Sequence, residues 1–159
     1  MLHLINTSDG SHTLLNTAQN ETYHSRHGAL QESRHVYLKN GLHFAMREFQ
    51  GKSLRLLEVG FGTGLNALLT LTETQVPIEY TTLEPFPLEW TLLEQLNYTT
   101  LLKNDNVTGI FRHLHQAPWS QLHTITPLFV RFSRITFHYF GNSYFVCYIK
   151  IHFFLISCP

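Results

Sequence analysis

Three glycines at alternating positions, Gly60, Gly62 and Gly64, follow directly on a short apolar run at residues 54–59. The apolar run predicts a buried strand of a parallel sheet, and residues 65–72 are compatible with a helix. Glycine has no Cβ, so the backbone can turn sharply and a ligand can approach it closely. A strand, a glycine loop and a helix in this order build the nucleotide pocket of an α/β sheet. The stretch therefore predicts an α/β fold with a pocket at the end of this strand.

The spacing of the glycines distinguishes between ligands. A dinucleotide site uses Gly-x-Gly-x-x-Gly, and a P-loop needs a Lys and a Ser or Thr after its last glycine. This chain has Glu-x-Gly-x-Gly-x-Gly, and no Lys or Arg lies between Arg55 and Lys103. A loop without a nearby cation suits a ligand without phosphates, such as S-adenosylmethionine. The same spacing disfavours an NAD-linked oxidoreductase.

Two acidic residues stand where such a ligand needs them. Glu58 lies at the end of the first strand, where it can meet the ligand's ammonium group. Residues 78–83 predict the next strand, and Glu84 ends it, 24 positions after Gly60. In dinucleotide folds an acid about 20 residues after the glycines binds the ribose hydroxyls. Glu84 is therefore a candidate for ribose binding, and the alternative is an ordinary surface glutamate at a strand end.

Beyond the loop, several stretches resemble one family: residues 21–42, 58–70, 82–88, 94–98 and 115–119. They are similar to the bacterial tRNA methyltransferases that complete 5-methylaminomethyl-2-thiouridine at the wobble position. In some bacteria this methyltransferase is fused to an FAD-dependent oxidase. The resemblance covers about residues 1–127. It implies a class I S-adenosylmethionine methyltransferase fold, which is a Rossmann-like parallel sheet, here with an N-terminal β-hairpin and helices. It also implies S-adenosylmethionine as cofactor and the aminomethyl group of wobble uridine in tRNA as acceptor.

The resemblance carries site residues onto this chain. The residues in cofactor-binding positions are Glu58, Gly60, Phe61, Gly62, Gly64, Leu65, Asn66 and Glu84. Phe61 by itself is more typical of a packing residue than of a stacking platform. Tyr23, His24 and Ser25 fall in a segment that lies near the pocket in the family, so we expect them at the substrate side.

The chain departs from the family after Pro127. The family continues with further strands, one of which carries an Asp-Ala-Phe-Ala-Pro-like motif with the expected catalytic acid. Residues 128–159 hold no Asp or Glu and are rich in Phe and Tyr. We expect residues 1–127 to form the N-terminal extension and first half of a methyltransferase domain, and residues 128–159 to be an anomalous tail. Its apolar stretch at residues 144–157 has high β-propensity.

The departure from the family after Pro127 removes the expected catalytic acid. The catalytic residue stays unknown, and Glu32 is the nearest substitute that the sequence offers. We therefore expect a methyltransferase truncated at its C-terminus and impaired in turnover. The alternative is a non-catalytic remnant without a stable ligand site.

The charge of the chain does not indicate a nucleic-acid partner. The formal net charge is zero, and residues 1–105 hold all 11 acids. A nucleic-acid binder commonly shows a strongly basic face, so tRNA binding is expected from the resemblance only. The chain lacks a basic segment followed by an apolar one at its N-terminus, and the apolar tail is too short for a membrane span. The sequence predicts a cytoplasmic protein without a membrane partner.

Eleven histidines raise the question of a metal site. Zinc needs three or four ligands at defined spacings, and the pairs His24/His27 and His113/His115 have no cysteine nearby. We expect no metal. His24, His27 and His35 are predicted to line the pocket or a helix surface, and His113, His115 and His123 to be solvated loop residues.

The remaining elements follow from local signals. Asp9-Gly10 between apolar residues predicts a hairpin over residues 2–15, and Asn40-Gly41 predicts a break between helices at 29–39 and 43–49. Pro87 is suited to the first position of a helix that continues to about Asn97. Residues 104–109 predict a turn or short loop.

Overall fold

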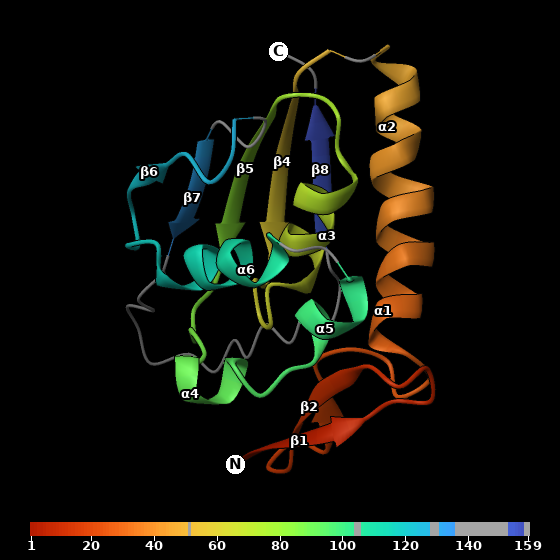
Figure 1. Cartoon of the computed structure of the whole chain (residues 1–159), viewed down its shortest axis with the longest axis vertical. Coiled ribbons are helices and arrows are strands. Elements are labelled where there is room, and N and C mark those ends of the chain that lie inside the picture. The colour runs from red at the N-terminus through yellow and green to blue at the C-terminus, as the bar shows by residue number, and fades with distance from the viewer. Residues whose placement is uncertain (51, 104–105, 128–130, 136–152, 158–159) are drawn as a thin grey trace, which may run out of the picture.

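In the computed structural model, the described residues are 1–50, 52–103, 106–127, 131–135 and 153–157. Their main sheet has the strand order β6-β7-β5-β4-β8. Strands β4, β5 and β7 run parallel, whereas β8 is antiparallel to β4 and β6 to β7 (Figure 1). The strand bounds are β4 (Leu54–Val59), β5 (Ile78–Leu83), β6 (Leu122–His123), β7 (Arg131–Ile135) and β8 (Phe153–Ser157). The predicted α/β class with a parallel sheet is confirmed.

Helix α3 (Leu65–Glu73) connects β4 to β5, as predicted for a βαβ unit. Alternate residues of the two strands are buried, among them Leu54, Leu56 and Tyr80, because one sheet face packs under helices. Val59 pairs with Leu83, so both strands end at the same level. The loops that leave these strands therefore start side by side.

The N-terminal residues form a separate antiparallel sheet of β1 (Leu2–Asn6), β2 (His12–Asn16) and β3 (Glu21–Thr22). The predicted hairpin is confirmed, and Gly10 takes the positive φ of 81° that its turn requires. This sheet lies beyond the end toward which β4 and β5 point (Figure 1). The N-terminal extension therefore stands at the carboxyl ends of the central strands.

One long helix follows, with α1 (Ala29–Glu32), a π-helical middle η1 (Ser33–Leu42) and α2 (His43–Glu48) running into one another (Figure 1). The predicted break at Asn40-Gly41 is wrong. Tyr37, Leu38 and Leu42 are buried along this helix, and the Tyr37 hydroxyl hydrogen-bonds Thr70 of α3. One helical glycine costs only about 1 kcal/mol, which the burial of several large side chains outweighs.

The segment after β5 differs from the prediction. Helix α4 covers only Trp90–Leu93 and begins after Glu89, so Pro87 does not start it. A separate helix, α5 (Tyr98–Leu102), follows. Helix α6 (Val107–Gln116) takes up Gly109, so the predicted loop at residues 104–109 is wrong from residue 107 onward, and residues 104–105 lie outside the described residues. Its residues Val107, Phe111 and Leu114 are buried at helical spacing.

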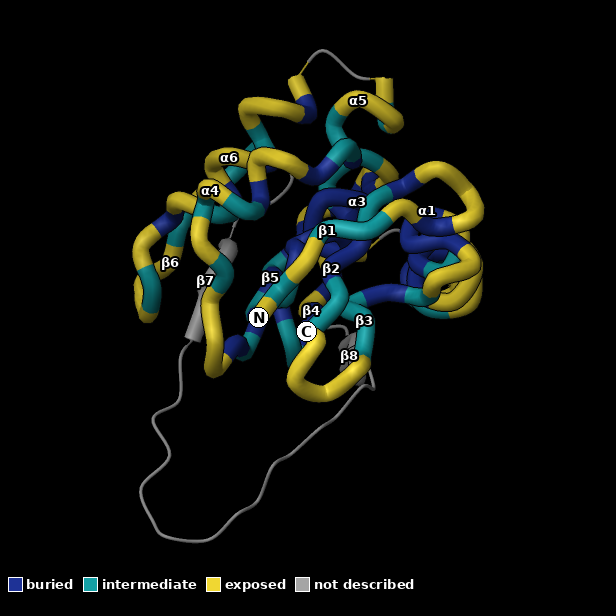
Figure 2. Tube along the Cα trace, turned by 90° about the horizontal axis from the view of Figure 1, so that it is seen from below, coloured by how far each residue is buried: buried dark blue, intermediate teal, exposed yellow. Residues whose placement is uncertain are grey.

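The tail at residues 128–159 has two described parts, β7 beside β5 and β8 beside β4. Strand β8 falls within the stretch 144–157, for which the sequence predicts β-structure, and residues 144–152 of that stretch lie outside the described residues. Figure 2 shows the buried segments gathered around α3, α1 and the central strands, with exposed stretches on the outer helices and turns. No helix within the described residues has the length and apolar character to cross a membrane.

Asn97 ties the N-terminal hairpin to the helices. Its Oδ1 accepts the His12 backbone N–H at 2.8 Å, and its Nδ2 donates to the Gly10 carbonyl at 2.9 Å. Residue 97 thus links two segments more than 80 positions apart in the sequence.

We predict that Asn97→Ala lowers the free energy of unfolding by about 1–2 kcal/mol, because a hydrogen bond at a partly exposed site contributes about 0.5–1.5 kcal/mol. Urea unfolding followed by circular dichroism measures this. The control Asn40→Ala removes an exposed helical asparagine and should not destabilise the chain. A change in Asn97→Ala no larger than in the control would contradict the tether.

Candidate functional site

The loop between β4 and α3 depends on its glycines. Gly60, Gly62 and Gly64 have φ values of 91°, 51° and 70°, which side-chain-bearing residues rarely adopt. Space is also limited, because a Cβ on Gly64 would lie 2.6 Å from His115 Nε2. A Cβ on Gly62 would lie 3.1 Å from Tyr23 Cδ1. The close turn predicted from the sequence is confirmed at all three positions.

Glu84 holds this loop against the end of β5. Its Oε2 accepts the Gly62 backbone N–H at 2.8 Å, and its Oε1 accepts the Phe86 N–H at 2.8 Å. Burial raises the pKa of this carboxyl, and the backbone N–H groups of Gly62, Phe86 and Phe61 partly oppose the rise. The side chain is 8% exposed. The candidate ribose acid therefore lies at the loop, already engaged with its backbone.

Thr63 connects the loop to three other parts of the chain. The Tyr98 hydroxyl donates to Thr63 Oγ1 at 3.3 Å, and His24 Nε2 lies 2.9 Å from the same oxygen. The His115 Nε2–H donates to the Thr63 carbonyl at 3.1 Å, since a carbonyl only accepts. The N-terminal extension, α5 and α6 thus meet at one loop residue.

His24 lies between the glycine loop and Glu32. Its Nε2 is 2.9 Å from Thr63 Oγ1, and its Nδ1 is 3.8 Å from Glu32 Oε2. The ring is buried. His24 therefore brings the loop and Glu32 close to one another.

The predicted substrate residues gather beside this contact. Glu32 Oε2 accepts the Ser25 backbone N–H at 2.9 Å. A surface depression of about 400 Å³ is lined by residues 20–27 and Glu32. Tyr23, which belongs to this lining, lies against Gly62. The structure thus brings Tyr23, His24, Ser25 and Glu32 together next to the predicted cofactor loop.

Glu58 lies beneath the loop with no exposed surface. Burial raises its pKa to about 8, and the facing side chains of Thr82, Tyr80 and Asn66 partly oppose the rise. Neither carboxylate oxygen forms a hydrogen bond of normal geometry within the described residues. A fully buried carboxylate cannot contact a ligand in this arrangement, so a direct role for Glu58 with an ammonium group would need the site to open.

The other predicted cofactor residues divide by accessibility. Gly60 and Gly62 are half-buried, so their backbone can be approached. Phe61, Gly64, Leu65 and Asn66 are buried, and Phe61 belongs to the core, as its packing interpretation predicted. The surface offered to a ligand is therefore backbone at two glycines, with the Glu84 carboxylate behind it.

The sequence reasoning missed three residues of the site, namely Thr63, Tyr98 and His115. His113, His115 and His123 do not lie in loops as predicted, because the first two lie in α6 and the third in β6. His113 is exposed, as predicted, whereas His115 is half-buried. The His115 ring packs 5.0 Å from the Phe61 ring and 4.7 Å from the Phe111 ring. The helical spacing of the buried residues in α6 was the signal that could have placed His115 beside the loop. Within the described part of the chain, no three His, Cys, Asp or Glu residues group as metal ligands.

Comparison with known proteins supports a partial resemblance. No protein-family profile matches the chain. It is 35% identical over 75 residues to the tRNA 5-methylaminomethyl-2-thiouridine biosynthesis bifunctional protein MnmC of Methylobacillus flagellatus, a match that covers 43% of this chain and 12% of that protein. The resemblance seen in the sequence is confirmed for this part of the chain, which spans only a small part of its relative.

A solved structure shares the fold. MnmC2 from Aquifex aeolicus superposes with a TM-score of 0.52 at 23% sequence identity. The superposition covers 86% of this chain and 42% of the Aquifex chain. At this identity the comparison shows a common α/β fold, and this chain spans less than half the length of the Aquifex chain.

The raised pKa of Glu58 makes the free energy of unfolding depend on pH. An unfolded glutamate has a pKa of about 4.5 and the folded one about 8, so between these values the folded chain binds more protons than the unfolded chain. This contribution is complete below pH 4.5 and is lost as the pH rises toward 8. We predict that the free energy of unfolding falls across this window, by at most about 1.4 kcal/mol per pH unit from this group.

Denaturant unfolding at a series of pH values measures the slope. Glu58→Gln should flatten it, leaving the smaller part of the same sign that Glu84 contributes. The control Glu73→Gln removes an exposed carboxylate of α3 and should leave the slope unchanged. Equal slopes in the parent and Glu58→Gln would show that Glu58 is not the titrating group.

Proposed function

We propose that the chain binds S-adenosylmethionine at the Gly60–Gly64 loop, as a class I, Rossmann-like methyltransferase does. The observation that supports this proposal is the loop itself. Its three glycines have positive φ, and it follows β4, which ends at the same level as β5. The Glu84 carboxylate accepts a hydrogen bond from its backbone. In open α/β sheets ligands bind at the carboxyl ends of the strands. Glu84 then exchanges part of its hydrogen bonding for the ribose hydroxyls.

The proposed acceptor is the aminomethyl group of wobble uridine in tRNA. The name of the Methylobacillus relative and the five motif stretches support this assignment. The position of the N-terminal extension supports it as well, because Tyr23 and His24 contact the loop that would hold the methyl donor. On this proposal, residues 1–127 supply the cofactor side of the domain and residues 128–159 supply the flanking strands β7 and β8.

Methyl transfer to an amine is a displacement at the methyl carbon, in which the C–N bond forms as the C–S bond breaks. The cofactor supplies the activated methyl group. The chain's own task is to position a neutral amine in line with it, which can lower the barrier by about 7–11 kcal/mol at best. A nearby carboxylate can accept the amine's proton. We assign this role to Glu32, which accepts the Ser25 N–H and lies 3.8 Å from the His24 ring.

We predict that the chain binds S-adenosylhomocysteine and that Gly62→Ala weakens binding at least about tenfold, since a side chain at φ 51° is strained and meets Tyr23. Isothermal titration calorimetry measures both dissociation constants. The matched control is Gly10→Ala, which puts the same change at a φ of 81° in the hairpin turn, where no atom lies within 4 Å.

Weakening in Gly62→Ala but not in Gly10→Ala supports the loop as the site. Equal affinities in the parent and Gly62→Ala place the ligand elsewhere. A folded parent that shows no binding overturns the proposal and favours the non-catalytic remnant.

We further predict slow transfer of labelled methyl from S-adenosylmethionine to tRNA bearing 5-aminomethyl-2-thiouridine, with turnover at least about tenfold lower in Glu32→Gln. A general base contributes about 10²–10⁴-fold, while the affinity for S-adenosylhomocysteine should not change. Glu21→Gln removes a carboxylate that lines the same depression from β3 and is the control. Equal turnover by Glu32→Gln and the parent would remove Glu32 from the mechanism.

A further inference from the structure

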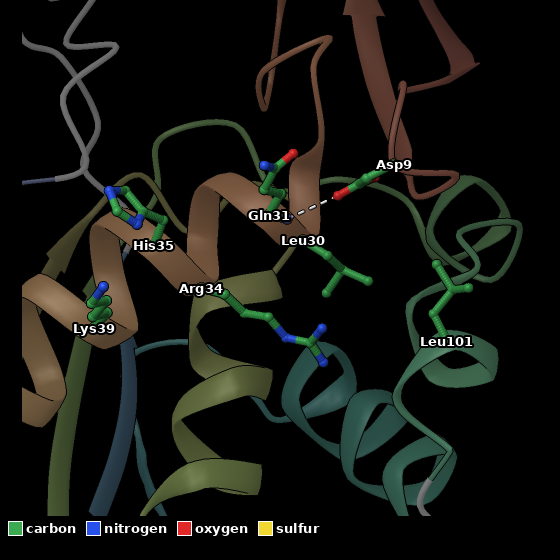
Figure 3. A pocket seen from close by; sticks show the side chains of 7 residues that line it. All are labelled: Asp9, Leu30, Gln31, Arg34, His35, Lys39 and Leu101. Carbon is green, nitrogen blue, oxygen red and sulfur yellow. Dashed lines mark hydrogen bonds between the residues drawn. The ribbon is translucent and has the colours of Figure 1, made fainter.

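A second depression, of about 590 Å³, lies between the long helix, the hairpin turn and α5. Asp9 lines it from the turn and Leu101 from α5, and the helix contributes Arg34, His35 and Lys39 (Figure 3). In Figure 3 the Arg34 side chain extends from the helix into the space between it and α5. The predicted cofactor and substrate residues do not line this depression.

The basic residues of this depression come from one stretch of the long helix. Arg34, His35 and Lys39 all belong to η1, and all three line the depression. In Figure 3 Arg34 extends toward the side of Leu101, whereas His35 and Lys39 lie on the other side of the helix. The cations therefore lie along the depression and not at a single point.

The charges of this depression are available to a ligand. Arg34, His35 and Lys39 are all exposed, and no ion pair to them occurs among the described residues. The one carboxylate of the lining, Asp9, is engaged elsewhere: it accepts from Thr7 Oγ1 and Ser11 N through Oδ1, and from Gln31 N through Oδ2. Its pKa is lowered to about 2: burial alone would raise it, and the hydrogen bonds from Ser11, Gln31 and Thr7 together outweigh that effect. The lining keeps a net positive charge.

The two depressions border the same turn of helix. Gln31 lines the basic depression and its neighbour Glu32 lines the one with Tyr23, His24 and Ser25. A long polyanion bound along the basic side would therefore pass next to the proposed acceptor side.

We propose that Arg34, His35 and Lys39 bind the phosphate backbone of the RNA whose base enters the neighbouring depression. Arginine and lysine supply most sequence-independent contacts to nucleic-acid phosphates, and a guanidinium can bind a phosphate through two parallel hydrogen bonds. This inference rests on the proposed function, since it takes tRNA as the partner. It adds a location and named contacts on the chain.

The test measures binding of tRNA to the full chain by fluorescence anisotropy over a series of salt concentrations. The variant Arg34→Gln/Lys39→Gln should bind on the order of tenfold more weakly at low salt. Its plot of log affinity against log salt should be shallower by about 1.5, since two phosphate contacts are lost. The control Arg47→Gln/Lys52→Gln removes the same charge from exposed positions at the far end of the same helix and just after it. It should behave like the parent.

The outcomes separate the two proposals. Calorimetry with S-adenosylhomocysteine should give one dissociation constant for the parent and both double variants, and absence of binding there overturns the proposed function alone. Equal weakening of tRNA binding in both double variants shows that only net charge matters and overturns the basic depression as the RNA contact. Unchanged binding in Arg34→Gln/Lys39→Gln overturns it as well. Circular dichroism confirms that the exposed substitutions leave the fold intact.

Discussion

The tethering of the loop between β4 and α3 is the constraint on which the rest of the site depends. Three left-handed glycines give the loop its path, and Glu84 holds the Gly62 N–H. Thr63 then connects it to His24 of the N-terminal extension, Tyr98 of α5 and His115 of α6. A change in the loop path would therefore alter contacts with the N-terminal extension, α5 and α6 together. The residues proposed for the cofactor and for the acceptor are positioned by one set of contacts.

The burial of two carboxylates near this loop has an electrostatic consequence. Removal from water raises the pKa of both Glu58 and Glu84, and only Glu84 receives backbone N–H groups in compensation. Glu58 is surrounded by side chains that do not form hydrogen bonds of normal geometry with it. Buried polar groups without such bonds cost free energy and cluster at functional sites. Glu58, whose burial costs free energy, lies two residues before Gly60 of the glycine loop, where an α/β fold places its ligand.

Much of the fold followed from local signals. The hairpin around Asp9-Gly10 and the β4–α3–β5 unit each depend on residues close in sequence, and both are confirmed. Predictions failed where distant packing decided the outcome. Asn40-Gly41 has the signal of a helix end, but the burial of Leu38 and Leu42 carries the helix through it. Pro87 has the signal of a helix start, but the chain first forms the Glu84 turn, in which Phe86 N–H binds the carboxylate.

The sequence by itself determined the α/β class, the glycine loop and the pair of acids, because the spacing of glycine and apolar residues acts over a few positions and needs no distant partner. Tertiary structure alone decided that Thr63 joins three elements, that His115 packs on Phe61, and that Glu58 is fully buried. It also decided that Arg34 and Lys39 line one depression with Asp9 of the hairpin turn and Leu101 of α5. These arrangements join residues far apart in the chain, and their energies arise only when the elements pack.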